Sequence, residues 1–484
     1  MAHDITISKI SESYIHLACS PSILREISNR FTFDVPGAKF SPAYRNKYWD
    51  GKIRLLDSRK QSLFSGLVQS VIDFAADHDY TVTDDTGLSV PIDFSLEKAK
   101  DFATALNLPV EPRDYQLHAF ATAIRNRRAV LVSPTGSGKS LIAYLITQFY
   151  NKKTLIVVPT VSLVMQLVKD FQSYGYDAPI HGVMAGVEKN TEADITISTW
   201  QSVFREDAEF FEQFEVIIGD EAHLFKAKSL ISIMTKMNNT KYRFGMTGTL
   251  DGAEVHELIL TGLFGVVEKI IDTSSLMQRG SLAQLKIKIL VLKHDAESCK
   301  LLQQTPTYQD ELQFIVASND RNIFIRNLAS SLKGNTLVLF AYVEKHGKIL
   351  HSLIKNQCTH DNVFFVAGEV EAENRETIRG IVEKSDNAII TASYGTYQQG
   401  INIKRLHNII FASPTKSRIR TLQSIGRGLR RGDDKDRCRL FDIADDLTYR
   451  NKKNYTLKHL IERVKMYNTE SFSYELHDIE LKRG

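Results

Sequence analysis

The chain has 484 residues, and at roughly 150 residues per domain this length predicts about three structural units. Hydrophobic residues make up 43% and charged residues 24% of the chain, which excludes a mainly disordered or low-complexity protein. Lys and Arg number 61 against 57 Asp and Glu, so the net charge of +4 permits a polyanionic partner without requiring one.

The cysteine spacing and the hydropathy pattern exclude further classes. The four cysteines (Cys19, Cys299, Cys358 and Cys438) form no CxxC pair, so neither a zinc ribbon nor a disulfide framework is expected. The start of the chain has no basic stretch followed by an apolar one, and the longest nearly apolar stretch, 258–267, is shorter than the ~18 residues of a spanning helix. We therefore expect a soluble, cytoplasmic protein that binds no membrane.

Residues 1–85 predict a small α+β unit that binds nucleic acid. Two alternating stretches favour strands, and a helix is expected to begin after Ser20 with Pro21 in its first turn. Segment 36–60 holds seven Lys or Arg against two Asp, among Phe40, Tyr44, Tyr48 and Trp49. Such basic residues can neutralise phosphates while aromatic rings stack on bases. The equal alternative is that the aromatic residues pack in a core beneath a solvated basic rim. The candidate contacts are Lys39, Arg45, Lys47, Trp49, Lys52 and Arg54.

A linker with one helix, from Leu96 to Leu106, is expected within 86–110. From there on the chain alternates short β-branched runs with longer helical segments, which predicts two α/β domains with parallel sheets, 111–275 and 276–446. The first five runs are 129–133, 154–159, 195–199, 216–220 and 243–247, and the second five are 336–341, 363–368, 388–393, 408–413 and 440–444. In 447–484 we expect a basic amphipathic helix and a polar tail, and the helix is equally open to docking on the second domain or to contacting nucleic acid.

The segment SPTGSGKS (133–140) follows a predicted strand and opens an apolar helical run. Its glycines allow backbone N–H groups to surround phosphate oxygens, Lys139 can reach the β- and γ-phosphates, and Ser140 can bind Mg²⁺. The expected nucleotide contacts in this segment are Pro134, Thr135, Gly136, Ser137, Gly138, Lys139 and Ser140. Ser133 stands where the usual pattern has its first Gly.

Two acidic residues end the strand in VIIGDEAH (216–223). At that position Asp220 can hold Mg²⁺ while Glu221 orients and deprotonates the attacking water. A helix-capping role would explain the pair alone, but not the pair together with Lys139. In QSIGRGLRR (423–431), Arg427 and Arg430 are three residues apart, so on a helix they would share a face and could reach a γ-phosphate.

These motifs, in this order, resemble those of the superfamily 2 helicases over about residues 110–446. The resemblance rests on RDYQ (113–116), PTGSGKS, VPTVSLVMQ (158–166), STWQS (198–202), DEAH, TGT (247–249) and QSIGRGLR. It implies two RecA-like lobes that bind ATP and Mg²⁺ at their interface. It also implies roles for individual residues: adenine reading by Arg113 and Gln116, γ-phosphate sensing by Gln423, Arg427 and Arg430, coupling by Thr247 and Thr249, and nucleic-acid backbone contacts by Pro159, Thr160, Gln166, Thr199, Gln201, Gly368, Thr391 and Gly400. One departure is Asn402, where many family members have Asp.

More narrowly, the N-terminal arrangement resembles that of the recombination and repair helicases of tailed phages. This implies an ATP hydrolase that unwinds and branch-migrates forks, Holliday junctions and R-loops, with strand annealing as a further activity. Implied partners are branched or duplex DNA with single-stranded regions, and RNA within RNA–DNA hybrids, bound by a monomer in the host cytoplasm. Two alternatives stay open: a DExH-type RNA helicase, and an ATP-gated strand-binding or annealing module that does not unwind processively.

Overall fold

The computed structural model describes residues 3–35, 37–184, 186–189, 191–302, 307–358, 362–368, 372–400, 403–431 and 435–481, so Asn402 lies outside it. The chain divides into two compact units, one of residues 1–133 with 138–270 and one of residues 271–484 with 134–137. The first unit holds the N-terminal region and the first lobe, and the second unit holds the second lobe. No helix in these described ranges is long and apolar enough to cross a membrane.

The N-terminal region is α+β, as predicted, with a mixed sheet of order β5-β2-β1-β6. Its helix α1 begins as expected, because the Ser20 hydroxyl accepts the N–H of Ile23 and Pro21 is the first helical residue. A second helix, α3, was not predicted, and both helices pack on the sheet through one apolar core. The bounds are β1 (Ile5–Lys9), β2 (Tyr14–Cys19), α1 (Pro21–Arg30), β5 (Ser62–Phe64), α3 (Val68–Asp77) and β6 (Val82–Asp84).

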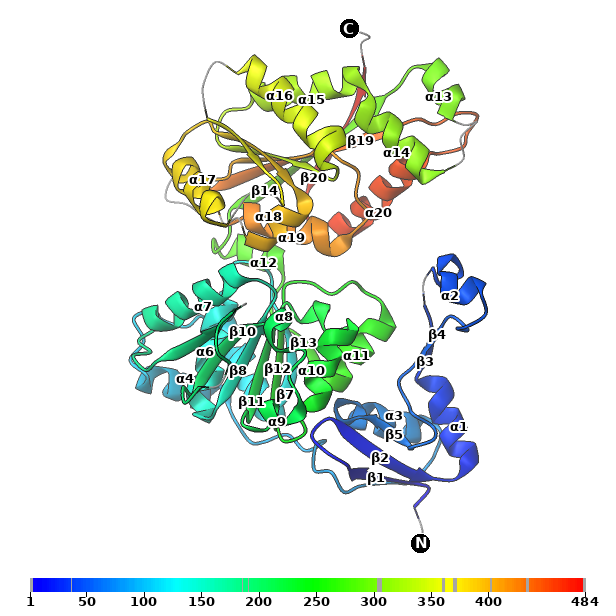
Figure 1. The fold of residues 1–484 in the computed structure, drawn as a ribbon, viewed down its shortest axis with the longest axis vertical. Coiled ribbons are helices and arrows are strands. Elements are labelled where there is room, and N and C mark those ends of the chain that lie inside the picture. Colours follow the sequence, from blue (N-terminus) through cyan, green and yellow to red (C-terminus); the bar gives the residue numbers. More distant parts are fainter. Residues whose placement is uncertain are drawn as a thin grey trace. The chain divides into compact units, whose positions relative to one another are not determined.

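Residues 37–54 form an arm on this region. The antiparallel strands β3 (Thr32–Asp34) and β4 (Lys52–Arg54) make a short ribbon, and the chain between them carries the helix α2 (Pro42–Arg45) away from the four-stranded sheet (Figure 1). The base of the ribbon is anchored because Phe33 and Ile53 pack against the apolar core of the first lobe.

The N-terminal region is joined to the first lobe through a buried polar contact. Arg128 forms an ion pair with the Glu12 carboxylate and donates to the Glu12 carbonyl at 2.8 Å and to the Ser65 hydroxyl at 2.7 Å. Beside it, Arg243 donates to the Ser13 hydroxyl at 2.9 Å. A Cβ on Gly66 would lie 1.9 Å from the carbonyl oxygen of Thr261, so the two parts meet without space for a side chain there.

The first lobe is an all-parallel sheet of order β13-β7-β12-β11-β8-β10-β9 with helices on both faces (Figure 1). Successive strand residues alternate between two apolar cores, for example Ile156 in one and Val157 in the other, which explains why these runs are apolar throughout. The bounds are β7 (Arg128–Val132), β8 (Thr154–Val158), β9 (Ile180–Val183), β10 (Ile195–Thr199), β11 (Val216–Asp220), β12 (Tyr242–Thr247) and β13 (Val266–Lys269), with helices α4 (Leu96–Ala105), α5 (Asp114–Asn126), α6 (Lys139–Tyr150), α7 (Val161–Ser173), α8 (Trp200–Val203), α9 (Ala208–Glu212), α10 (Lys228–Lys236) and α11 (Glu254–Phe264).

The second lobe, which follows α12 (Thr273–Gln278), is also all-parallel, with strand order β16-β17-β15-β18-β19-β14-β20. The fold class is therefore as predicted. The bounds are β14 (Gln284–Lys293), β15 (Thr336–Phe340), β16 (Val363–Val366), β17 (Ile389–Ser393), β18 (Asn408–Phe411), β19 (Arg437–Asp446) and β20 (Tyr474–Glu480), with helices α13 (Ala296–Leu302), α14 (Tyr308–Ala317), α15 (Asn319–Ser331), α16 (Lys348–Gln357), α17 (Ala372–Lys384), α18 (Tyr394–Gly400), α19 (Arg418–Gly428) and α20 (Tyr455–Thr469).

Two segments differ from the sequence prediction. Residues 474–480 are not a polar tail, because they form β20 and pair in parallel with β14. The helix α4 does form, but the segment around it is packed rather than extended as a linker: Phe94 and Phe102 lie in an aromatic cluster with Phe120 and Phe149 of the first lobe.

Candidate nucleotide and nucleic-acid sites

The phosphate loop connects β7 to α6, as the sequence predicts. Gly136 and Gly138 have φ of 86° and 80°, a left-handed conformation that residues with a Cβ seldom adopt. A Cβ on Gly138 would lie 2.3 Å from the side-chain nitrogen of Gln116. The Lys139 ammonium donates to the Ser133 carbonyl at 3.1 Å, within the loop. The loop can therefore place N–H groups and a cation around phosphate oxygens.

Gln116 connects the start of α5 to this loop. Its amide oxygen accepts the Arg113 N–H at 2.9 Å, and its amide nitrogen donates to the Gly138 carbonyl at 3.3 Å. Gln116 is buried, whereas the Arg113 guanidinium is on the surface and donates to the Tyr115 hydroxyl at 2.9 Å. The two residues predicted to read adenine thus lie at the phosphate loop, and their contact with a base remains a prediction.

The acidic pair lies at the carboxyl end of β11. Burial and the neighbouring Glu221 charge raise the pKa of Asp220 to about 6, while the Lys139 charge acts in the opposite direction. Glu221 has a φ of 50°, a left-handed conformation that costs a non-glycine residue on the order of 1 kcal/mol. Backbone strain and a perturbed carboxyl group at one strand end are typical of an active site.

The raised pKa predicts that wild-type Asp220 destabilises the protein at neutral pH. For an acid with a higher pKa in the folded state, stability falls as pH rises from about 4 to about 6 and then stays level. In Mg²⁺-free buffer, Asp220→Asn should therefore be more stable than wild type at pH 7, by on the order of 2 kcal/mol. Thermal unfolding at pH 7.5 and pH 4.5 tests this, because the difference should shrink at the lower pH. A variant that is less stable at both pH values would contradict it.

A hydrogen-bond chain joins the acidic pair to the predicted coupling residues. His223 Nδ1 lies 3.3 Å from a Glu221 carboxylate oxygen and 3.0 Å from the Thr247 hydroxyl. The Thr247 hydroxyl in turn donates to the Thr249 carbonyl at 3.1 Å. Two side chains therefore connect Glu221 to Thr249. The coupling role of Thr247 and Thr249 stays a prediction, and His223 was not predicted.

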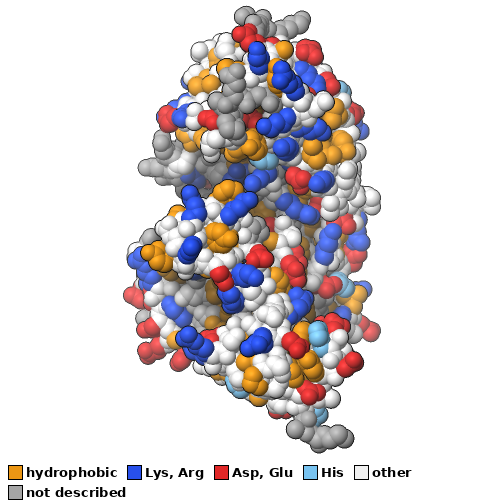
Figure 2. Space-filling view, turned by 90° about the vertical axis from the view of Figure 1, so that its right-hand side faces the viewer, with side chains coloured by type: hydrophobic (Ala, Val, Ile, Leu, Met, Phe, Trp, Pro, Cys, Tyr) orange, Lys and Arg blue, Asp and Glu red, His pale blue; other side chains and the backbone are white. Residues whose placement is uncertain are grey.

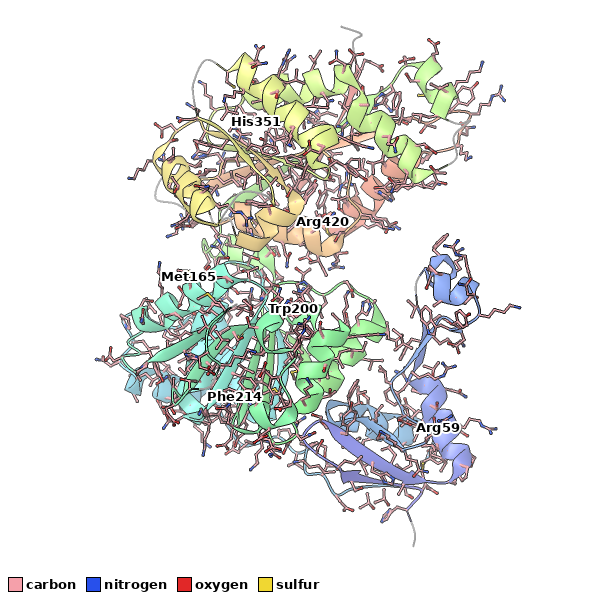
Figure 3. All side chains as sticks on the ribbon, viewed as in Figure 1. Arg59, Met165, Trp200, Phe214, His351 and Arg420 are labelled. Atoms are coloured by element: carbon pink, nitrogen blue, oxygen red, sulfur yellow. The ribbon has the colours of Figure 1, made fainter. Side chains whose placement is uncertain are left out.

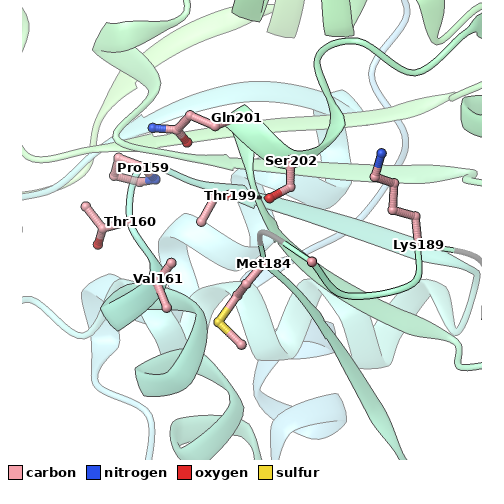
Figure 4. Close-up of a pocket in the computed structure, with 9 residues that line it drawn as sticks. Pro159, Thr160, Val161, Met184, Lys189, Thr199, Gln201 and Ser202 are labelled. Atoms are coloured by element: carbon pink, nitrogen blue, oxygen red, sulfur yellow. Dashed lines mark hydrogen bonds between the residues drawn. The ribbon is translucent and has the colours of Figure 1, made fainter. Parts of the chain in front are cut away.

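The same edge of the first lobe carries a pocket of about 400 Å³. Figure 4 shows the residues that line it, which follow or end three neighbouring parallel strands, β8, β9 and β10. The pocket brings together four predicted nucleic-acid contacts with residues that sequence reasoning missed. It is lined by the predicted residues Pro159, Thr160, Thr199 and Gln201, and by Val161, Met184, Gly186, Lys189 and Ser202.

Gln166, by contrast, does not line this pocket and lies on the exposed face of α7. In the second lobe, Gly368 is exposed after β16, with open space where a Cβ would be, and Gly400 ends α18. The prediction for Thr391 does not fit its position. Thr391 is fully buried in β17, and its hydroxyl donates to the Phe364 carbonyl and bonds to His351, so we correct its role to a structural one.

The three predicted γ-phosphate sensors are only partly on one helix. Gln423 and Arg427 are on α19, but the helix ends at Gly428 and Arg430 lies beyond it. A Cβ on Gly428 would lie 2.3 Å from Ile409, so Gly428 allows the end of α19 to pack closely on β18. All three side chains are partly exposed and can approach a ligand.

Some aromatic residues of the arm are free of any core, and others pack within the arm. Tyr48 is 87% exposed and Phe40 is 70% exposed, so neither belongs to a core. The Trp49 indole instead donates to the Lys52 carbonyl at 2.8 Å and braces the ribbon, while Tyr44 packs over Gly51. Five basic residues of the arm are exposed: Lys39, Arg45, Lys47, Lys52 and Arg54. Arg59, next to the arm and labelled in Figure 3, is exposed as well. Figure 2 shows many Lys and Arg side chains on the face that it draws.

Comparison with known proteins agrees with this geometry. Residues 4–85 match the family model "DNA helicase UvsW, N-terminal", and residues 109–252 match "Type III restriction enzyme, res subunit". The ATP-dependent DNA helicase uvsW of Enterobacteria phage T4 is 34% identical over 99% of this chain and 100% of its own length. The crystal structure of T4 UvsW covers 99% of this chain and 100% of its own, with a TM-score of 0.52 and 32% identity.

A more limited match is the DNA 3'-5' translocase XPB2 of Sulfurisphaera tokodaii, which is 34% identical over 32% of this chain and 35% of its own. Because the T4 relative is matched along its full length, by sequence and by structure, the likeness includes the N-terminal region as well as both lobes. The chain belongs to the UvsW family of ATP-dependent DNA helicases, within superfamily 2.

Proposed function

We propose that this helicase uses ATP hydrolysis to unwind and branch-migrate branched DNA, namely forks, Holliday junctions and R-loops, and that it anneals complementary strands. The observation that carries the proposal is the exposed basic and aromatic arm fixed to the first lobe. Basic side chains hold phosphates independently of sequence, and exposed rings can stack on unpaired bases where strands separate. A junction offers both targets side by side.

We further propose that Mg²⁺ accompanies ATP in the phosphate loop. Asp220 and Ser140 supply the oxygen ligands that Mg²⁺ prefers. Asp220 lies at the end of β11 and Ser140 at the phosphate loop, where such a site is expected. When bound, Mg²⁺ would offset the charge that develops on the phosphates. Lys139 then holds the phosphates, and Glu221 orients and deprotonates the attacking water. Arg427 and Arg430 would stabilise charge on the γ-phosphate.

The pocket at β8, β9 and β10 is proposed to hold one DNA backbone. Thr160, Thr199 and Gln201 offer polar groups to phosphate oxygens. Lys189 adds a cation, which pairs with the Glu206 carboxylate and would exchange this partner for a phosphate. The hydrogen-bond chain of Glu221, His223 and Thr247 starts at the same sheet edge as this pocket. Hydrolysis of the bound nucleotide can therefore alter how the pocket holds the DNA backbone. We also propose that the motor acts as a monomer and accepts RNA paired with DNA.

Synthetic four-way junctions with mobile arms test the proposal. The wild-type protein with ATP should convert them to duplex products, and a nonhydrolysable ATP analogue should not support conversion. A protein that pairs complementary strands but leaves the junction intact would instead be an annealing module. Displacement of RNA duplexes in preference to DNA would make it an RNA helicase.

The arm gives a separate prediction. Replacing Lys39, Arg45 and Lys47 by Gln should weaken junction binding and lower the slope of log K against log salt by roughly 2–3, since each phosphate contact contributes about 0.9. Tyr48→Ala should weaken binding by about 1–3 kcal/mol without changing that slope, because stacking does not release counterions. Fluorescence anisotropy over a salt series measures both effects.

The matched control removes equal charge elsewhere in the first unit. The control replaces three exposed lysines that lie away from the sheet edge with the phosphate loop: Lys98 and Lys100 on α4, and Lys152 near the amino end of β8. Their replacement by Gln should leave the salt slope unchanged within about 0.5, because none of them is expected to contact a phosphate. An equal effect of the two triple replacements would contradict a specific role for the arm.

A further inference from the structure

The helix α19, which carries Gln423 and Arg427, is held at its entry by the C-terminal helix α20. Buried Arg463 of α20 donates from Nη1 to the carbonyl of Thr415, in the segment that leads into α19, at 2.7 Å. Its Nε and Nη2 donate to the two carboxylate oxygens of Asp442 in β19, each at 2.8 Å. One side chain therefore fixes the entry of α19 to the central sheet.

Two further contacts strengthen this connection. Tyr467, one turn beyond Arg463 on α20, is fully buried and donates to the Asp442 carboxylate at 2.8 Å. Glu470, after the end of α20, accepts from Arg418, the first residue of α19, at 3.0 Å. Arg420, labelled in Figure 3, lies over the ring of Tyr394, whose hydroxyl donates to the Ser413 carbonyl at 3.0 Å.

The other end of α19 is held by a second buried cation. The Lys435 ammonium donates to the carbonyl of Gly428 and, at 3.0 Å, to the carbonyl of Arg430. Between them, the carbonyl of Leu429 accepts the N–H of Ala283 at 2.8 Å. Three successive carbonyls at and just after the end of the helix are thus each bound by a donor, whereas an isolated helix leaves its last carbonyls to water. They include the backbone of Arg430 itself.

We infer that Arg463 and Lys435 are positioning residues for ATP hydrolysis, because they fix the two ends of α19 and so set the place of Arg427 on the helix and of Arg430 just beyond it. This rests on the proposed role of Arg427 and Arg430. A buried ion pair seldom adds stability over apolar packing, but its directed hydrogen bonds fix a geometry. Arginines that act on a γ-phosphate depend on such placement, since a shift of about 1 Å can cost roughly 100-fold in rate.

The positioning role of Arg463 explains part of the basic character of α20. The sequence leaves open whether this helix docks or contacts nucleic acid. Arg463 faces inward, and Leu460, Met466 and Tyr467 are buried with it, so this face of α20 docks on the second lobe. The buried charge of Arg463 therefore holds the segment before α19 and does not contact a DNA phosphate.

The test is a kinetic comparison of full-length variants at saturating DNA. Arg463→Met combined with Asp442→Leu removes both buried charges, so no unpaired carboxylate is left to unfold the lobe. It should lower kcat by roughly 10- to 100-fold while KM for ATP changes less than about threefold. Binding of a fluorescent ATP analogue should be retained. Tyr467→Phe, which deletes one hydroxyl, should lower kcat a few-fold. Arg463→Lys, which keeps a buried cation beside Asp442, should lose less of the rate than the double variant.

The control is Arg379→Met, which removes an arginine from a surface pair with Glu376 on α17 and should keep the wild-type rate. Arg427→Ala is measured in parallel. If Arg427→Ala turns over ATP normally, the proposed role of the arginines is wrong. If Arg427→Ala is inactive but the folded Arg463/Asp442 double variant and Tyr467→Phe keep wild-type kcat, the positioning role alone is overturned.

Discussion

Lys139→Ala should abolish ATP turnover while leaving the fold and DNA binding nearly intact. Its ammonium is the cation of the phosphate loop and donates to the Ser133 carbonyl at 3.1 Å, and the residue is partly exposed. Loss of one group that stabilises developing phosphate charge costs on the order of 100- to 1,000-fold in kcat. Steady-state ATPase rates with saturating DNA, together with thermal unfolding, measure both parts of the prediction.

Lys241→Ala is the matched control, because Lys241 is an exposed lysine that precedes β12 at the opposite edge of the same sheet. It should keep the wild-type turnover. Substantial ATPase activity in Lys139→Ala, or the same loss in both variants, would contradict the assignment of the nucleotide site to the phosphate loop.

The largest expected effect on stability is at the contact between the N-terminal region and the first lobe. Arg128→Met would leave the buried Glu12 carboxylate with the partly exposed Lys9 as its remaining ion-pair partner, which costs up to about 3–5 kcal/mol. The N-terminal region should then separate from the lobe and become sensitive to protease. Limited proteolysis and thermal unfolding should show this, and junction binding should weaken because the arm loses its fixed base.

The double variant Arg128→Met with Glu12→Leu should recover most of the lost stability, since it removes both charges and leaves an apolar contact. Recovery in the double variant would distinguish an unpaired charge from a packing defect. A single variant that differs from wild type by less than about 1 kcal/mol would show that the pair does not hold the two parts together.

The strands that sequence reasoning found are those buried on both faces of a sheet, because they are apolar throughout. β14 was missed since its first half alternates Lys with apolar residues, and only alternate residues of that half are buried. β20 was missed since it lies at the sheet edge with nearly all of its side chains exposed, so its residues resemble a polar tail. Both depend on neighbours distant in the sequence.

The candidate site was predictable to the extent that each motif is local. The phosphate loop and the acidic pair were placed correctly at strand ends, because loop and strand are adjacent in the chain. The bond from His223 to Thr247 was not predictable, since it depends on the order of β11 and β12 in the sheet. Lys189 was missed because it follows β9, a four-residue strand too short to be recognised.

The most direct test of the central claim is the ATPase rate of the wild-type protein with no nucleic acid, single-stranded RNA, single-stranded DNA, linear duplex and a four-way junction, with strand displacement scored in the same reactions. A branch-remodelling DNA motor should be stimulated most by the junction and should convert it in step with ATP use. Greater stimulation by RNA, or ATP use on the junction without any displacement, would contradict the account.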